Sequence, residues 1–129
     1  MFFGGDYFGF DDALFAAARL LAFVARRGGP LSALLADVPK MYSTPELRIE
    51  CPEERKFAIV QAAAQVFSER YDVATLDGAR ITFANGWGLI RASNTQPVLV
   101  MRFEAESESD LAAYRGEVED WLRAQGISP

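Results

Sequence analysis

Residues 46–129 predict an α+β domain, with an antiparallel four-stranded sheet and two helices on one face. Two observations predict this class. The segments of residues 46–125 follow the order strand, helix, strands and helix, which is typical of α+β domains rather than of regularly alternating α/β ones. Asp77-Gly78 lies between two apolar segments, and this dipeptide is a strong signal for a turn between antiparallel strands.

The domain begins with a predicted strand and a predicted helix. Leu47 and Ile49 alternate with charged residues over 46–50, which is the pattern of a strand with one solvent-exposed face. Pro52 and the two glutamates that follow it indicate the start of a helix. The apolar side of this helix consists of Phe57, Val60, Ala64 and Phe67.

The second half of the domain contains most of the predicted strands and the last helix. The strand segments are residues 73–76, 80–83, 87–91 and 98–104. Ser107, with Asp110 three residues later, has the capping-box spacing that predicts a helix N-terminus. The apolar side of the last helix consists of Leu111, Tyr114, Val118, Trp121 and Leu122.

Residues 1–37 are interpreted as a separate piece, and residues 38–45, which include two prolines, as a hinge or connector. Residues 1–10 are rich in aromatic residues and glycine, and they predict extended chain or a short hairpin. The rest of the piece predicts a long helix and then a short one.

The long helix of this piece has clear end signals. Asp11 or Asp12 predicts its N-cap, and the two glycines after Arg27 predict its end. Pro30 begins the second, short helix. The long helix is apolar around nearly its whole circumference, so it needs neighbours on more than one side.

Composition excludes several classes of function. Thirteen Lys and Arg against 18 Asp and Glu give a net charge of −5, so we expect neither a nucleic-acid partner nor a basic membrane-surface helix. No apolar segment is long enough to span a membrane. The N-terminus has no basic region ahead of an apolar one, as a secretory signal would have. We therefore expect a cytoplasmic protein.

The chain contains no histidine, which excludes histidine general bases, Ser-His-Asp triads and histidine-containing zinc sites. Cys51 is the single cysteine, so an internal disulfide is impossible. The acidic pairs Asp11-Asp12 and Glu53-Glu54 are typical of helix starts, where carboxylates favour the positive end of the helix dipole. We predict no catalytic residue and no metal site in this chain.

Residues 91–97, with the sequence Arg-Ala-Ser-Asn-Thr-Gln-Pro, are the strongest candidate site. A phosphate dianion needs several converging donors, and a planar guanidinium provides two of them together. Consecutive backbone N–H groups in a short turn form an anion-binding concavity. The same residue types also favour ordinary turns, and Arg91 can equally pair with a surface carboxylate. The residues alone leave both interpretations open.

This loop and its flanks resemble the C-terminal domain of the α-D-phosphohexomutases, bacterial phosphomannomutase/phosphoglucomutase in particular. The flanks that carry the resemblance are Gly86-Trp87-Gly88 before the loop and residues 98–105 after it. Residues 8–12, 43–46 and 75–78 resemble further family segments, so the similarity covers residues 2–122. The resemblance implies a TATA-box-binding-protein-like fold for residues 46–129.

By the family pattern, Arg91, Ser93, Asn94 and Thr95 contact the phosphate of a glucose or mannose phosphate. The resemblance implies a parent enzyme that interconverts hexose 1-phosphate and hexose 6-phosphate through a phosphoserine and a bisphosphorylated intermediate. The phosphoserine and Mg²⁺ of that enzyme would lie on other domains, outside this chain. The family's serine, metal and sugar loops have no match here, and Gly4-Gly5-Asp6 resembles the sugar loop only superficially.

We therefore expect a C-terminal fragment, in which the end of domain 3 (residues 1–37) is joined to domain 4 (residues 46–129). Such a chain would be catalytically incomplete without domains 1–3, which would be its natural partners. The alternative is a non-catalytic interaction or dimerisation module with the same fold. The nearly all-apolar first helix favours this alternative, because an uncovered helix can self-associate.

Overall fold

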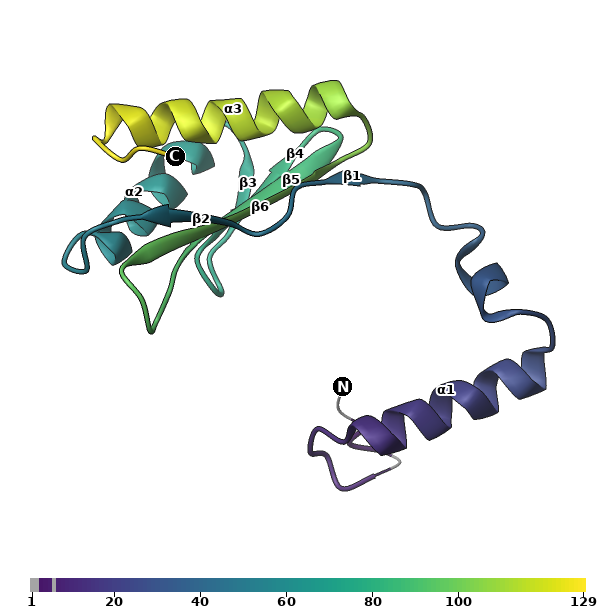
Figure 1. Ribbon diagram of the computed structural model, residues 1–129. Helices are drawn as coiled ribbons and strands as arrows, with labels where there is room; N and C mark the ends of the chain where they lie inside the picture. Colours follow the sequence, from purple (N-terminus) through teal and green to yellow (C-terminus); the bar gives the residue numbers. More distant parts are fainter. Residues whose placement is uncertain (1–2, 6) are drawn as a thin grey trace. The chain divides into compact units, whose positions relative to one another are not determined.

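The computed structural model describes residues 3–5 and 7–129, and the chain divides into two compact units, Met1–Val38 and Pro39–Pro129 (Figure 1). The first unit contains helix α1 (Ala13–Arg27) and the short 3-10 helix η1 (Leu31–Leu35). The second contains the sheet and the two remaining helices among the described residues.

Helix α1 begins and ends where the sequence predicts. The Asp12 carboxylate accepts the Phe15 N–H at 2.9 Å and so caps the first turn. Gly28, with a φ of 72°, follows the last turn, and its N–H donates to the Val24 carbonyl. None of the helix residues is buried within the described chain, and Leu14 is 84% exposed.

The predicted extended segment or hairpin at residues 1–10 is wrong for the part that the structure describes. The described residues here form turns, and the Tyr7 N–H donates to the Phe3 carbonyl at 2.9 Å. The Tyr7 ring stacks on Phe15 with centroids 4.0 Å apart, and its hydroxyl donates to Asp12 at 2.9 Å. Through these contacts Tyr7 packs against the N-terminal end of α1. Met1, Phe2 and Asp6 of the predicted segment lie outside the described residues.

The second unit is an antiparallel sheet with the strand order β1-β6-β5-β4-β3, in which β2 also pairs with β6. The strands are β1 (Tyr42–Ser43), β2 (Leu47–Glu50), β3 (Asp72–Ala74), β4 (Ala79–Phe83), β5 (Gly86–Ala92) and β6 (Val98–Ala105). The predicted α+β class and antiparallel sheet are confirmed. Six strands are found in the described residues instead of a four-stranded sheet. The predicted segment 73–76 corresponds to the short edge strand β3, whereas the two-residue strand β1 had no predicted counterpart.

Helices α2 (Lys56–Ser68) and α3 (Glu108–Ala124) lie on one face of this sheet, as predicted (Figure 1). The buried residues of both helices join the inward-facing strand residues in one cluster. Phe57, predicted on the apolar side of α2, is instead 53% exposed, because the buried side of this helix consists of Lys56, Ile59, Val60, Ala63 and Phe67. Phe67 of α2 and Trp121 of α3 meet edge to face, with ring centroids 5.8 Å apart. The largest apolar members of the core are Phe67, Ile81, Ile90, Leu99, Met101, Phe103 and Leu122.

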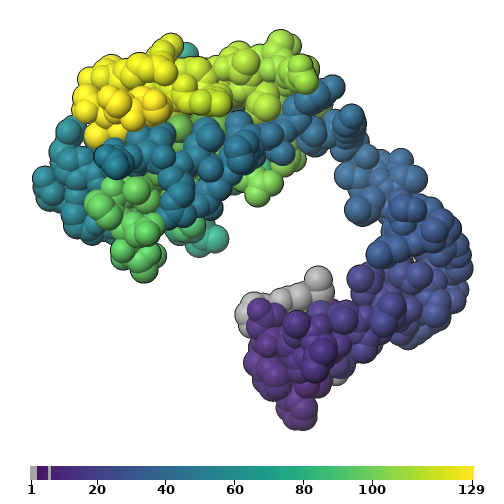
Figure 2. All heavy atoms as spheres, viewed as in Figure 1, coloured from purple at the N-terminus to yellow at the C-terminus, as the bar shows by residue number. Residues whose placement is uncertain are grey.

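The end of α3 is fixed beside the start of α2. Arg55, just before α2, donates from its guanidinium to the Gln125 carbonyl at 2.7 Å. In the space-filling view the C-terminal residues lie against the segment that contains β2 (Figure 2). Ile127 is buried there and belongs to the core. The C-terminal segment thus contributes to the core of the second unit.

The β5–β6 hairpin is the longest pairing of the sheet, running from Gly86↔Ala105 to Ala92↔Leu99. Gly88 permits its packing, because a Cβ there would lie 2.7 Å from the Phe103 ring. Tyr42 and Ser43, within the predicted connector, pair with Ala105 and Glu104 at the other edge of β6. The hairpin is therefore paired with other strands on both sides, and its tip extends from a rigid sheet.

Candidate functional site

Of the candidate loop predicted at residues 91–97, Arg91 and Ala92 end β5 and residues 93–97 form the tip of the β5–β6 hairpin. Ser93 organises this tip. The Ser93 N–H donates to the Val98 carbonyl at 3.0 Å, which closes the loop. The Ser93 hydroxyl oxygen accepts the N–H groups of Thr95 and Gln96 at 3.3 and 3.2 Å. A hydroxyl has two lone pairs and one hydrogen, so the Ser93 O–H is left to donate to a ligand. Ser93 itself is only 7% exposed.

Arg91 lies at the end of β5, beside the turn between β3 and β4. Its guanidinium Nη1 is 3.6 Å from Asp77 Oδ2, which is an ion pair at longer than hydrogen-bond distance. The turn approaches closely because Gly78 has a φ of 91° and no side chain. A Cβ at Gly78 would lie 2.4 Å from the Ile90 carbonyl oxygen and 2.6 Å from the Arg91 Cβ. Arg91 therefore has the carboxylate partner that the alternative interpretation anticipates.

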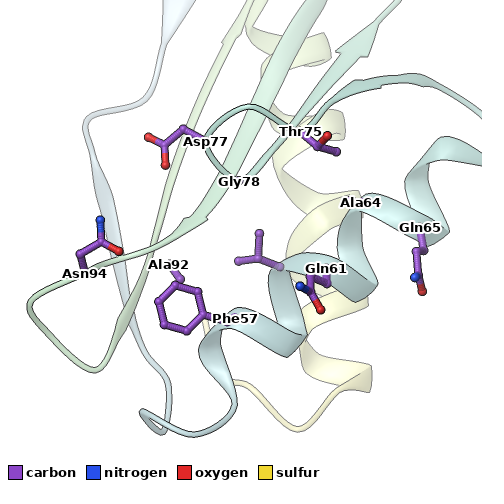
Figure 3. A pocket seen from close by; sticks show the side chains of 10 residues that line it. Phe57, Gln61, Ala64, Gln65, Thr75, Asp77, Gly78, Ala92 and Asn94 are labelled. Atoms are coloured by element: carbon purple, nitrogen blue, oxygen red, sulfur yellow. The ribbon is translucent and has the colours of Figure 1, made fainter.

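Asn94 and Thr95 are exposed on the loop, and Asn94 borders a pocket of ≈ 630 Å³. The pocket lies between the loop, the β3–β4 turn and the side of α2 that runs from Phe57 to Gln65 (Figure 3). Phe57 forms an apolar wall, and the polar side chains of Asp77 and Asn94 lie at one side (Figure 3). The four predicted residues thus lie at one end of the hairpin. Ser93 is buried there, whereas Asn94 and Thr95 are exposed to solvent.

Lys56 is a neighbour of the loop that the sequence analysis did not identify. It is the first residue of α2 and is only 1% exposed. Its ammonium donates to the Gln96 carbonyl at 3.1 Å and pairs with Glu53 at 2.6 Å. The signal in the sequence is its position, because Lys56 shares the buried side of α2 with Ile59, Val60, Ala63 and Phe67.

Gln96 is also held through its side chain. The Arg48 guanidinium, on β2, donates to the Gln96 carboxamide oxygen and pairs with Glu46 at 2.8 Å. Gln96 is therefore bonded through its N–H, its carbonyl and its side chain, to the loop itself, to α2 and to β2. The loop is anchored to two further elements besides its own hairpin.

Metal centres and reactive thiols are two further kinds of site. No group of three or more Cys, Asp or Glu side chains that could hold a metal ion occurs among the described residues. Cys51 is 2% exposed, and burial raises the pKa of its thiol, which disfavours the reactive thiolate. Within residues 3–5 and 7–129, no helix has the length and apolar character needed to cross a membrane.

A family model supports the assignment of the second unit. The model of the phosphoglucomutase/phosphomannomutase C-terminal domain matches residues 46–120. These residues run from the start of β2 into α3 and include the whole candidate loop. The match therefore covers the part of the chain in which the hairpin and its supporting helix lie.

Relatives with curated names match nearly the whole chain. The phosphomannomutase/phosphoglucomutase of Pseudomonas putida is 42% identical over 120 residues, which are 92% of this chain and 25% of the relative. The phosphoglucomutase of Neisseria gonorrhoeae is 43% identical over 112 residues, 84% of this chain and 24% of the relative. The chain thus spans about a quarter of the length of these relatives.

A solved structure gives the same result. The crystal structure of a phosphoglucomutase/phosphomannomutase family protein from Burkholderia thailandensis matches with a TM-score of 0.80 and 41% identity. The match covers 95% of this chain and 26% of that chain. Together with the domain model, these similarities show that the chain belongs to the phosphoglucomutase/phosphomannomutase family and contains the family's C-terminal domain.

Proposed function

We propose that this chain supplies the substrate-phosphate site of a phosphosugar mutase that interconverts hexose 1-phosphate and hexose 6-phosphate. The observation that carries the proposal is the β5–β6 loop, where a guanidinium, a carboxamide and two hydroxyls lie at one hairpin end. The Ser93 hydroxyl brings the N–H groups of Thr95 and Gln96 together, at 3.3 and 3.2 Å from its oxygen. Membership of the family supports this interpretation.

In the proposed site the loop positions the substrate and performs no bond chemistry. Arg91 would give a charge-assisted pair of hydrogen bonds, and Ser93, Asn94 and Thr95 would give neutral ones. Such a loop holds the phosphate that does not react, so that the other end of a glucose or mannose phosphate lies at the reacting group. Positioning and electrostatic stabilisation are the main contributions that proteins make to phosphoryl transfer.

The remaining parts of the reaction would lie outside this chain. We infer that a phosphoserine and Mg²⁺ belong to domains 1–3 of the full-length enzyme, which are the partners of residues 1–129. The described residues offer no group of three ligands for a metal ion, so no step of the proposed role passes through one. The proposed domain limits are residues 1–37 for the end of domain 3, 38–45 for the hinge and 46–129 for domain 4.

The variant Arg91→Ala tests the proposed role. The wild-type chain should bind inorganic phosphate with millimolar affinity, about −4 kcal/mol, because it lacks the contacts that other domains would add. Arg91→Ala should abolish this binding, while Arg123→Ala, which removes the same charge from α3, should not affect it. Affinity can be measured from amide shifts in NMR titrations. Equal binding by the wild-type and Arg91→Ala chains would refute the proposed site.

A second candidate function is that of an interaction or dimerisation module. The observation that favours it is the exposed apolar surface of α1, where Leu14 is 84%, Leu21 70% and Phe23 52% exposed. Apolar side chains at this density mark surfaces that associate with another protein surface. The two functions are compatible, because they use different units of the chain.

A further inference from the structure

Lys56 is a buried charge for which the phosphate-binding proposal gives no role. Its side chain is 1% exposed, whereas its ion-pair partner Glu53 is 64% exposed. Removing an ammonium group from water is costly unless its partners compensate for the lost hydration. A methionine of similar length would fill the same space on the apolar side of α2 without that cost. Packing alone therefore does not account for a buried lysine at this position.

The contacts of Lys56 connect α2 with the β5–β6 loop. The ammonium donates to the Gln96 carbonyl at 3.1 Å, across 40 positions of the sequence. The same carbonyl accepts the Val98 N–H at 2.8 Å, so its oxygen is held by two donors. The backbone N–H of the same residue, Gln96, donates to the Ser93 hydroxyl. Lys56 thus fixes the residue whose N–H belongs to the candidate anion-binding turn.

We propose that Lys56 is a positioning residue that fixes the β5–β6 loop in its phosphate-binding conformation by holding the Gln96 carbonyl. This inference rests on the proposed function of the loop. The carbonyl carries partial negative charge and would repel a phosphate if it turned toward the ligand. Held by Lys56 and Val98, it leaves the Ser93 and Thr95 hydroxyls and the Thr95 and Gln96 N–H groups as the donors that the loop presents.

The structure predicts that this role is separable from stability. In Lys56→Met, Glu53 stays hydrated and the Gln96 carbonyl keeps the Val98 N–H, so neither group is left buried without a partner. Replacing a buried charge by an apolar side chain of similar size is often neutral or stabilising. We therefore expect an unchanged or higher free energy of unfolding together with weaker phosphate binding. A purely structural lysine would give the opposite result, lower stability with normal affinity.

The test is a titration of the ¹⁵N-labelled 129-residue chain with inorganic phosphate. The chain has two lysines, so Lys40→Met is a matched control that removes the same charge from an exposed position. Wild type and Lys40→Met should bind equally, and Lys56→Met should bind about tenfold more weakly, the effect of one charge-assisted hydrogen bond. Even before phosphate is added, the amide signals of residues 93–96 in Lys56→Met should be shifted or broadened relative to the wild-type chain. The signals of the core should be unchanged.

The outcomes separate this inference from the proposed function. Wild-type binding together with equal binding by Lys56→Met would overturn the role of Lys56 and leave the phosphate site intact. No binding by the wild-type chain would overturn the proposed function, and the inference with it.

A measurement on the wild-type chain covers the case in which Lys56→Met fails to fold. The Lys56 ammonium protons should exchange with water more slowly than those of Lys40, with and without phosphate. Equally fast exchange would contradict the bond to Gln96.

Discussion

Single side chains decide the conformation of the candidate loop. Ser93 is buried at the tip of the hairpin and accepts two consecutive N–H groups, while its neighbours Asn94 and Thr95 are exposed. A serine that bonds N–H groups two and three residues ahead is a local turn device. The same device creates the concavity that the proposed phosphate site requires.

Ser93→Ala tests this double role. The variant leaves the Thr95 and Gln96 N–H groups without their acceptor and removes one donor to the ligand. We expect phosphate affinity to fall by about 0.5–1.5 kcal/mol, the usual net value of a hydrogen bond. We also expect faster hydrogen exchange at Thr95 and Gln96, measured by NMR in the absence of phosphate. Unchanged exchange at both amides would show that Ser93 does not organise the loop.

The sequence analysis predicted the residues of the loop but not their supports. Arg91, Ser93, Asn94 and Thr95 are adjacent in the chain, so composition and resemblance suffice to select them, although their role stays a prediction. Lys56 is 40 positions from its partner Gln96, and no local pattern connects the two. The signal that the sequence does contain is a lysine among the apolar residues of one helix side.

At the level of elements, apolar periodicity and turn residues predicted most of the second unit. The N-cap at Ser107, the apolar side of α3 and the α+β class are found in the structure. The short edge strand β1 could not be predicted, since two residues carry no periodicity. Its pairing with β6 depends on contacts between residues far apart in the chain, such as Tyr42 with Ala105, that local sequence does not encode.

Close packing of the β5–β6 hairpin gives a prediction about stability. Gly88→Ala places a Cβ 2.7 Å from the Phe103 ring and should destabilise the second unit by about 1–3 kcal/mol, the cost of overpacking a core. Gly116→Ala is the matched control, because nothing lies within 4 Å of a Cβ there, in the interior of α3. That variant should stabilise by about 0.5–1 kcal/mol. Urea unfolding measures both, and equal effects would contradict the packing described.

A contact between elements predicts alkaline sensitivity. Tyr71, after α2, donates its hydroxyl to Glu117 of α3 at 2.9 Å. Burial, and then this hydrogen bond, raise the pKa of Tyr71 above its ordinary 10.0. The neutral phenol therefore contributes stability that is fully present below pH 10.0 and is lost as the pH rises through the raised pKa.

Tyr71→Phe has no phenol at this position to ionise. Its free energy of unfolding should therefore fall less steeply above pH 10.0 than that of the wild-type chain. Urea unfolding across this pH range measures both slopes. Parallel losses in the two chains would exclude Tyr71 as a contributor.

For the molecule as a whole, the contrast between the two units determines the expected behaviour in solution. Unit Pro39–Pro129 contains the buried core, whereas α1 in unit Met1–Val38 buries none of its described residues. Burying an apolar side chain of this size is worth about 1.5–3 kcal/mol. The exposed leucines and phenylalanine of α1 therefore favour association when no other surface covers them.

Sedimentation velocity tests this consequence. The wild-type chain should show a sedimentation coefficient that rises with concentration, and the double variant Leu14→Gln, Leu21→Gln should reduce the rise. Both positions are exposed on α1, so the substitutions should leave the second unit folded. Leu76→Gln is the control, since Leu76 is fully exposed in the β3–β4 turn. A wild-type chain that stays monomeric at all concentrations would eliminate the dimerisation form of this alternative.

The most direct measurement is an amide-resolved NMR titration of the whole chain with inorganic phosphate, glucose 1-phosphate and plain glucose. If the loop binds phosphate without other domains, both phosphates should shift the amide signals of residues 91–96, and glucose should shift none. The two phosphates should also have similar affinities, because no sugar contact is proposed in this chain. No shifts at these residues, or equal shifts with plain glucose, would contradict the phosphate-binding role.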